Sequence, residues 1–559
     1  MTRLITALLL AAVVPFAFAE KPVPQLPKVY IDTTFNQPTG NTWRAHTSTD
    51  FQNALNSANP NDVIVLDAGG TYLGNFTLPV KVNPNQEWIY IETSAVKSLP
   101  PPGTRVNPST DLVNMATIVT PNMTSAITIP PGASYYRLVG LEITSASTQG
   151  CDLHSIPIVN CYSYSLVDAA SVIGQTLVDS ITVDRSYLHG SPTQDVRRGV
   201  IANGSNIAVV DSYISDIHQS IHDSQAILAY YSPGPLKIVN NFLSATTEDV
   251  MFGGAGGKYN PWVPSDIEIR HNLFFKPLSW IAPGITLPPH PQWVVKNNLE
   301  FKSAQRVLVD GNMLENVWMG GGQQGYSVLF TVRTSQSGDI AVVDDITFSN
   351  NILQNVDAGF ATLYHDNACG SRRYRHCSKP GETRRIAVYN NLVLFRDPSL
   401  PGGARNIGLE MAHLMTDFVL QHNTFVPVPG TDCWNAVFFS VGRVRHWPPK
   451  ESITDNVWIL DNALCRQPTG DFGAQGTKGL TYYMGAPTPL DPRYLGNVMF
   501  VPSNNQVQQF PPHNYSTTVA FTYTDPQKGD YQLLIPDWRD TSDHQEAGIN
   551  NTMLQEHQQ

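Results

Sequence analysis

The stretch ITFSNNILQNV, residues 346–356, contains the pattern that decides the fold. Apolar residues alternate with polar ones as far as an Asn pair, and apolar residues resume behind it. Alternation with a period of two is typical of a β-strand with one buried face, and Asn is typical of a turn. The stretch therefore predicts two short strands joined by a tight turn.

The same pattern recurs along the chain. Two alternating apolar residues precede a polar turn residue, and an apolar pair follows it. The mean interval between turn residues is about 34 residues, which indicates a repeat architecture. The turn residue occupies these positions: Ser186, Ser212, Asn241, Asn272, Asn312, Asn351, Asn391, Asn423 and Asn462.

Each repeat also contains a second strand-like run before its turn residue. Examples are GVIANG from residue 199, QAILAYY from 225 and NAVFFSVG from 435. Helical periodicity is nearly absent, and the 42 Pro and 40 Gly favour many turns. A β-propeller would need antiparallel blades at a more regular period. A coil of parallel strands fits best, with successive units stacked about 4.8 Å apart.

Asn suits one corner of such a coil for two reasons. It tolerates the left-handed backbone of a tight turn. Its amide can also hydrogen-bond to the Asn residues above and below it, as in stacked amide ladders. We therefore interpret the recurring Asn as the corner of a stacked coil, with ordinary hairpin turns as the alternative.

On these repeats the chain resembles the right-handed parallel β-helix proteins of the pectate-lyase-like superfamily, from about residue 28 to 540. Distantly it resembles their chondroitinase and alginate lyase group. The resemblance implies an all-β, right-handed parallel β-helix with long loop insertions. It also implies a short capping helix at Asp50–Ala58, and a closing rung and C-terminal cap at 529–550. We expect one domain, 20–559, divided into a cap and first rungs (28–95), central rungs (135–470), and last rungs with the C-terminal cap (471–559).

The N-terminal residues predict a secretory signal peptide. Arg3 precedes the apolar run Leu4–Phe16, and Ala17-Phe18-Ala19 forms a small-residue cleavage site, so residues 1–19 are expected to be removed. A membrane anchor is the alternative, but the run is short for a span. We expect a secreted protein, extracellular or periplasmic, without a membrane span.

The cysteines and the net charge limit the partners. Six cysteines fit an oxidising compartment, and local pairing of Cys151 with Cys161, Cys369 with Cys377 and Cys433 with Cys465 is the simplest expectation, although the sequence does not fix it. No CxxC spacing indicates zinc. The net charge of −11 gives no sign of a nucleic-acid partner.

Polar residues that could carry chemistry concentrate in the middle of the chain. Glu300 and Lys302 are two apart and so share one strand face, between a run beginning with Glu248 and Asp249 and one ending at Arg333. A polysaccharide lyase needs to neutralise a uronate carboxylate, with Ca²⁺ or a cationic side chain. It also needs a base, such as a lysine with a lowered pKa, to remove the C5 proton.

This arrangement is similar in kind to that of the chondroitinase and alginate lyase group. It implies Lys302 and Arg333 as catalytic residues and Glu248, Asp249 and Glu300 as ligands of Ca²⁺. A solvated strand face with cross-strand ion pairs is the alternative. The residues expected to contact an extended polysaccharide are Lys258, Trp262, Arg270, His222, Tyr364 and His365.

The NTD, GHG and RIK motifs of polygalacturonase-type hydrolases are missing, as is the vWIDH signature of pectate lyases. Two classes of function remain. The first is a secreted, monomeric enzyme that cleaves an anionic, uronate-containing polysaccharide by β-elimination. The second is a non-catalytic coil that binds glycans or serves as a structural element of the cell surface.

Overall fold

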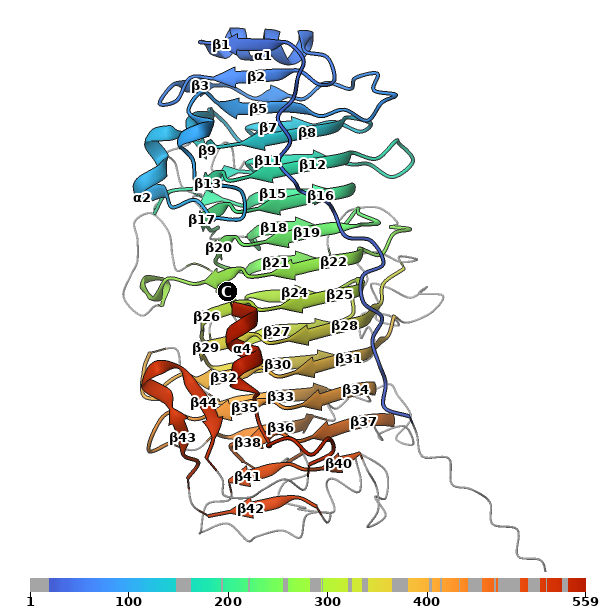
Figure 1. Ribbon diagram of the computed structural model, residues 1–559, viewed down its shortest axis with the longest axis vertical. Helices are drawn as coiled ribbons and strands as arrows, with labels where there is room; N and C mark the ends of the chain where they lie inside the picture. The colour runs from blue at the N-terminus through green and yellow to red at the C-terminus, as the bar shows by residue number, and fades with distance from the viewer. Residues whose placement is uncertain are drawn as a thin grey trace, which may run out of the picture.

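The computed structural model contains the coil of parallel strands that the repeats predict (Figure 1). Almost all the strands lie in three long sheets that run side by side along the coil axis. The structure describes residues 20–146, 162–192, 195–219, 222–254, 260–281, 293, 295–319, 324–333, 340–363, 381–401, 405–412, 415–431, 433–440, 455–466, 469–470, 493–500, 513–518, 520–534 and 541–558.

Sheet A contains the strands that lead into the turn residues. Its neighbours in space are successive laps of the chain, and all are paired in parallel. In order along the coil its strands are β1 (Thr42–Ala45), β2 (Val63–Leu66), β5 (Ile89–Thr93), β8 (Ser134–Val139), β12 (Asp179–Asp184), β16 (Ser205–Val210), β19 (Leu236–Val239), β22 (Ser265–Arg270), β25 (Ala304–Asp310), β28 (Val343–Ser349), β31 (Thr383–Tyr389), β34 (Thr416–Gln421), β37 (Asp455–Leu460) and β40 (Tyr494–Leu495).

Sheet B follows the turn residues and consists of short strands, which the apolar pair behind each Asn marks in the sequence. These strands are β3 (Thr71–Leu73), β6 (Ala116–Thr120), β9 (Leu141–Ser145), β13 (Tyr187–His189), β17 (Tyr213–Ile217), β20 (Phe242–Ala245), β23 (Leu273–Phe275), β26 (Met313–Val317), β29 (Ile352–Val356), β32 (Leu392–Phe395), β35 (Thr424–Val426), β38 (Ala463–Leu464), β41 (Val498–Phe500) and β42 (Tyr515–Thr517).

Sheet C completes each lap before the chain returns to sheet A. Its strands are β4 (Phe76–Thr77), β7 (Ile127–Ile129), β11 (Val167–Ala170), β15 (Arg198–Asn203), β18 (Gln225–Ala229), β21 (Glu248–Phe252), β24 (Leu299–Phe301), β27 (Tyr326–Thr331), β30 (Ala358–Leu363), β33 (Ile407–Ala412), β36 (Asn435–Ser440) and β39 (Thr469–Gly470). The parallel β-helix is thus confirmed, and its right-handed sense stays a prediction.

Few elements lie outside the three sheets. The short strands β10 (Tyr162–Ser163) and β14 (Asp195–Val196) pair in parallel, and β43 (Tyr523–Asp525) and β44 (Asp530–Leu533) pair antiparallel. The helices in the described part of the chain are α1 (Ser48–Ser57), η1 (Val96–Ser98), α2 (Pro108–Asp111), η2 (Leu112–Asn114), η3 (Leu278–Trp280), η4 (Pro526–Lys528) and α4 (Asn551–Gln558). None of these helices is long and apolar enough to cross a membrane.

The core fills the inside of the coil. Alternate residues of all three sheets point inward and are fully buried, and they form one continuous apolar cluster. In sheet C the rings of Phe252, Phe301 and Phe330 stack on successive laps, with centroids 5.5 and 5.8 Å apart. Leu299 and Phe301 are therefore core residues, as the alternation around Glu300 predicts.

The corner between sheets A and B carries the predicted Asn ladder. Oδ1 of Asn351 accepts hydrogen bonds from the backbone N–H and the Nδ2 of Asn312, both at 2.9 Å. The N–H and Nδ2 of Asn351 in turn donate to Oδ1 of Asn391, at 2.8 and 3.1 Å. The same pairing runs from Asn241 as far as Asn514, two laps beyond the repeats seen in the sequence.

One of the two reasons given for Asn is wrong in its position. The left-handed backbone belongs to the residue before the ladder position: φ is +56° at Asn350 and +53° at Asn390. Asp211, His271 and His422 have the same conformation at their corners, so this place accepts several residue types. The ladder position itself selects Asn because a buried amide both donates and accepts along the coil axis.

Helix α1 lies at the N-terminal end of the coil, beside β1 (Figure 1). Thr47 caps it, since its side chain accepts a hydrogen bond from the N–H of Asp50. The side chains of Phe51, Ala54 and Leu55 are buried against the core. The helix begins two residues before its predicted start and ends one residue before Ala58. Its role as an end cap stays a prediction.

The N-terminal segment before β1 runs along the outside of sheet A (Figure 1). The Nζ of Lys21 donates to Gln421, the N–H of Gln25 to Asp345 and the N–H of Lys28 to Asp266. Further along, Arg137 donates to the carbonyl of Thr33 at 2.8 Å. The segment therefore ties late laps of the coil to early ones.

The closing rung expected within 529–550 is not formed by the described residues there, and the expected C-terminal cap stays a prediction. Residues 523–533 form an antiparallel hairpin, β43 and β44, instead of a closing rung, and β42 is the last strand of the coil in the described chain. The tail then returns along the corner between sheets A and B. It contacts Asp461 through the N–H of Ser542 (2.7 Å), His422 through the carbonyl of Gly548 (3.0 Å), and Asp310 through His557 (2.8 Å).

We expect the tail to loosen in acid. Burial raises the pKa of Asp310, but hydrogen bonds from Asn350, His557 and Ser349 outweigh it and hold the pKa below its ordinary value. The ionised carboxylate therefore contributes stability that is fully present above about pH 4 and is lost as the pH falls further. Hydrogen–deuterium exchange in residues 541–558 should rise in that range, and Asp310→Asn should raise it already at neutral pH. Normal protection of the tail in Asp310→Asn would contradict this expectation.

The Cys433–Cys465 disulfide is present and buried. It joins the residues just before β36 and just after β38. The other four cysteines and the signal peptide lie outside the described residues.

Candidate functional site

The outward positions of sheet C are less polar than the sequence suggests. The residues that point outward from the middle of each strand pair with one another from lap to lap and so form one row along the coil axis. Most side chains of this row are apolar and buried. Charged groups instead gather where the strands begin and end. The members of this row are Ile201, Leu228, Met251, Glu300, Leu329, Ala361 and Glu410.

A chain of polar contacts crosses four laps at the edge of sheet C. Nε of Arg198 donates to Gln225 (3.1 Å), and Nε2 of Gln225 donates to Glu248 (2.7 Å). The Nζ of Lys296 lies 3.8 Å from Glu248 and 2.7 Å from Asp223. Together with the adjacent pair of Glu300 and Lys302, these side chains form what we call the sheet C cluster: Arg198, Asp223, Gln225, Glu248, Lys296, Glu300 and Lys302.

Glu300 and Lys302 form an ion pair, as their shared strand face predicts. The Nζ of Lys302 lies 3.3 Å from Oε2 of Glu300, and Thr331 on the next lap donates to Oε1 at 3.4 Å. Burial lowers the pKa of Lys302, but the carboxylates of Glu300, Glu248 and Asp223 outweigh it and raise the pKa above its usual value. Lys302 is therefore held protonated, which is the opposite of what a lysine base needs. Its role as the base stays a prediction.

Glu248 is the residue of the cluster whose ionisation falls near neutral pH. Its side chain is fully buried. Burial and the charge of Glu300 raise the pKa of Glu248 to about 7, against the opposing effect of Lys302 and Lys296. A carboxyl group with such a pKa can take or give a proton at physiological pH.

Asp249 lies next to Glu248 in sequence, but its side chain binds groups at the corner between sheets B and C. It accepts hydrogen bonds from the N–H of Ala245 (2.7 Å) and Nδ2 of Asn298 (2.9 Å), and it pairs with the buried Lys276 at 3.4 Å. Burial raises the pKa of Asp249 to about 6, and Lys276 opposes this. Both oxygens are used within this corner, so Asp249 is a structural residue.

The predicted calcium ligands therefore do not converge. Glu300 faces the ammonium group of Lys302, and Glu248 accepts from Gln225 near Lys296. Carboxylates occupied by ammonium groups do not make the oxygen cage that calcium prefers. Among the described residues, a group with metal-ligand spacing occurs at His422, Asp461 and Asp543, where it joins the tail to the coil.

The remaining residues predicted for the site lie at different distances from the sheet C cluster. Arg333 follows β27 directly beside Lys302, because its N–H donates to the carbonyl of Lys302 at 2.9 Å. His222 is exposed next to Asp223, and burial together with Arg197 and Arg198 lowers the pKa of its imidazole. Trp262 lies half-buried between β21 and β22.

Arg270 lies elsewhere, on sheet A, where it pairs with Asp310 at 3.2 Å. The structure therefore separates it from the sheet C cluster, and we do not retain it as a residue of this site. Lys258, Tyr364 and His365 lie outside the described residues.

Gln225 and Lys296 are members of the cluster that no sequence pattern indicated. Gln225 lies opposite Glu248 in the strand register, and aligning the second strand of each repeat would have placed the two together. Lys296 comes from the segment before β24, behind a long insertion, and no local pattern connects it with Glu248.

The chain is similar to several solved structures at low sequence identity. No protein-family model and no curated protein matches the chain. Similar solved structures include the alginate lyase from a Paenibacillus species (14% identity, TM-score 0.36, covering 68% of this chain and 93% of that one) and the polygalacturonase from Erwinia carotovora subsp. carotovora (13%, 0.43, 79% and 98%). An alginate lyase of family PL6 is a third (10%, 0.44, 92% and 57%).

Alginate lyases and a polygalacturonase are thus among the solved structures to which this chain is similar. The architecture itself is established by the strand pairing of this chain. At such low identity and TM-score the likenesses say nothing about which reaction the chain performs.

Proposed function

We propose that this protein is a secreted carbohydrate-active enzyme that cleaves an anionic, uronate-containing polysaccharide by β-elimination at the sheet C cluster. One observation carries the proposal: the pKa of the buried Glu248 is raised to about 7, and the ion pair of Lys302 and Glu300 on the next lap lies close enough to contribute to that pKa. An acid–base group beside a fixed cation is what the elimination requires.

In this proposal the roles follow from the charges. Lys302, supported by Arg333 on the next lap, neutralises the uronate carboxylate and so makes the C5 proton more acidic. We assign the acceptance of that proton to ionised Glu248, because the raised pKa of Lys302 removes the lysine from the role of base. This assignment requires the substrate to reach the carboxylate of Glu248, which is fully buried in the free protein. The electron pair forms the C4–C5 double bond, and the glycosidic O4 oxygen leaves with a proton from solvent.

The direct experiment is an assay of the purified, mature protein on separate uronate polymers, such as alginate, pectate, hyaluronan and chondroitin. Unsaturated products are followed by their ultraviolet absorbance. We expect absorbance to rise on one class of these polymers. Parallel reactions with Ca²⁺ and with EDTA test the calcium expectation from the sequence. No product on any uronate polymer would exclude the lyase proposal.

A non-catalytic, glycan-binding coil is the second candidate function. The observation in its favour is burial: Glu248 has no exposed side-chain surface, and the side chain of Lys302 is only 16% exposed. A buried ion-pair network of this kind is also explained by a purely structural role, in which it holds neighbouring laps together. Retained glycan binding without any product would support this second function.

A further inference from the structure

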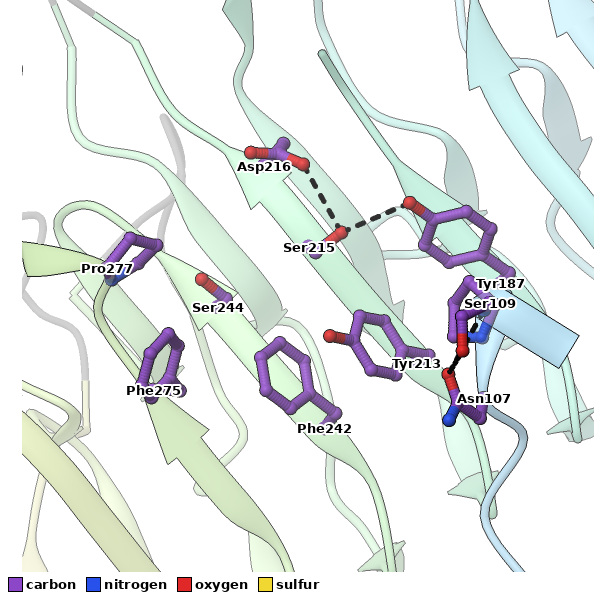
Figure 2. Close-up of a pocket in the computed structure, with 11 residues that line it drawn as sticks. Asn107, Ser109, Tyr187, Tyr213, Ser215, Asp216, Phe242, Ser244, Phe275 and Pro277 are labelled. Atoms are coloured by element: carbon purple, nitrogen blue, oxygen red, sulfur yellow. Dashed lines mark hydrogen bonds between the residues drawn. The ribbon is translucent and has the colours of Figure 1, made fainter. Parts of the chain in front are cut away.

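A pocket of about 340 Å³ lies on the outer face of sheet B, on a different face of the coil from the sheet C cluster (Figure 2). It extends over β13, β17, β20 and β23, which are four consecutive strands of the sheet. At about 4.8 Å per lap, the pocket floor is roughly 14 Å long in the direction of the coil axis.

Aromatic rings form most of the floor. The rings of Tyr213 and Phe242 stack with their centroids 4.0 Å apart, and Tyr187 and Phe275 continue the row at 5.6 and 5.7 Å. All four side chains are only half-buried. Tyr187, Tyr213 and Phe242 share one register position on successive laps. Phe275 lies two residues beyond Leu273, the register partner of Phe242, and its ring extends the same apolar surface.

Polar groups lie among and beside these rings, as Figure 2 shows. Asp216 stands at a β-bulge in β17, with φ at +53°. Among the described residues its carboxylate accepts a single hydrogen bond, a long one from the hydroxyl of Ser215 at 3.4 Å. Within the described chain, the hydroxyl groups of Tyr213 and Ser244 have no hydrogen-bond partner. The pocket therefore offers a carboxylate and unused hydroxyl groups next to an apolar floor.

Residues 107–109 form one wall of the pocket, and the segment 103–106 that leads into this wall is fastened to the coil. The N–H of Gly103 donates to the carboxylate of Asp211 (2.7 Å), and the N–H of Val106 donates to the carbonyl of Asp211 (3.0 Å). Arg105 donates to the carbonyls of Asn240 (3.1 Å) and His271 (2.9 Å). Because three laps hold this wall, the pocket is preformed.

The charge of the lining limits the ligand. Asp216 is its charged side chain, and no Lys, Arg or His lines the pocket in the described part of the chain. A uronate or sulfated sugar would meet this carboxylate without any compensating cation. An uncharged sugar instead matches the lining, since its C–H faces pack on aromatic rings and its hydroxyl groups hydrogen-bond to carboxylate and hydroxyl oxygens.

We propose that the pocket on sheet B binds an uncharged segment of a glycan chain, lying along the coil axis over Tyr187, Tyr213, Phe242 and Phe275. This binding site is independent of the chemistry proposed for the sheet C cluster. It would hold a neutral glycan on one face of the coil while another face meets an anionic polymer.

A bulky substitution in the fastened wall tests the proposal without disturbing the core. Ser109 is exposed and lines the pocket, whereas Thr110, also exposed, does not. Each hydroxyl group donates one hydrogen bond to Asn107, and that of Thr110 also donates to Asp111 at 3.1 Å, so the control loses at least as much local structure as Ser109→Trp. Ser109→Trp should therefore block the pocket, and Thr110→Trp is its matched control.

The probes are neutral hexasaccharides of glucose, mannose and xylose, titrated calorimetrically into the full mature protein beside an alginate hexasaccharide. We expect at least one neutral probe to bind and Ser109→Trp to weaken it by about tenfold or more, because the indole fills the volume. Thr110→Trp should bind like the wild type, and Tyr213→Phe should weaken binding severalfold.

Three results would overturn the proposal. The first is that no neutral hexasaccharide binds the wild type. The second is equal binding in Ser109→Trp and Thr110→Trp, which would place the ligand elsewhere. The third is that Ser109→Trp abolishes binding of the alginate probe alone, which would make the ligand anionic. None of these results depends on whether the sheet C cluster is catalytic.

Discussion

Replacing Asn351 by Ala is expected to lower the free energy of unfolding by about 4 kcal/mol. The side chain of Asn351 is fully buried and accepts two hydrogen bonds from Asn312. It also donates to the carbonyls of Val309 (3.1 Å) and Ser349 (2.8 Å) and to the amide of Asn391. Alanine leaves several of these partners buried and without a hydrogen bond, at about 1–3 kcal/mol for each.

Two further variants identify the cause of that loss. Gln354→Ala changes an exposed side chain on the same lap and should alter stability by no more than about 0.5 kcal/mol. Asn351→Gly should be as damaging as Asn351→Ala, because the ladder depends on the amide and not on a left-handed backbone. Urea unfolding of the three variants measures the differences. A stable glycine variant would show that backbone conformation, and not the amide, explains the Asn at this corner.

The repeats allowed the architecture to be predicted because they are a local signal. An alternating run, a buried amide and an apolar pair recur within ten residues, as at Phe348, Asn351 and Leu353, and each lap must satisfy the same packing as its neighbours. The sequence placed the left-handed backbone one residue too late, because both the turn position and the ladder position favour Asn, as Asn350 and Asn351 show. Stacked amides and tight turns favour the same residue type.

The two ends of the chain could not be predicted in this way. The tail reaches Asp310 through His557, across 247 residues, and Lys21 reaches Gln421 across 400. Such contacts replace strand pairing with single hydrogen bonds, which leave no periodic mark in the sequence. Gly311 is one place where a contact of the tail restricts the residue type, because a side chain at Gly311 would collide with the carbonyl of His557.

The candidate site was predicted only where its residues share a strand. The pairing of Glu300 with Lys302 follows from the alternation, and it is present at 3.3 Å. The separation of Glu248 from Asp249 does not follow, because the chain turns at the corner just before β21 and directs the two neighbouring carboxylates to different partners. Charge effects from neighbouring laps then set the pKa of Lys302, and a single strand contains no information about them.

Replacing Glu248 by Gln is expected to lower kcat by a factor on the order of 10²–10⁴, because it removes the proposed base while keeping its shape and its neutral hydrogen bonds. The folded-state pKa of Glu248 lies above its unfolded value, so its ionisation destabilises the fold as the pH rises toward 7. The glutamine variant should therefore be at least as stable as the wild type, and lost activity cannot come from unfolding. Glu315→Gln, the same change at a half-buried position of sheet B, is the matched control and should keep wild-type activity.

The pH profile distinguishes Glu248 from Lys302 as the base. If Glu248 accepts the C5 proton, kcat rises with pH through about 7 and then levels, since only the ionised carboxylate is active. Lys302→Met would then lower activity by removing the cation, while the residual activity keeps the same pH dependence. If Lys302 is the base, as the sequence led us to expect, kcat should rise only at a pH above the ordinary pKa of a lysine side chain. The kcat of Glu248→Gln should then stay within a few fold of the wild-type value. The two assignments thus predict opposite outcomes for one variant, because a protonated lysine among three carboxylates cannot serve as cation and base at the same pH.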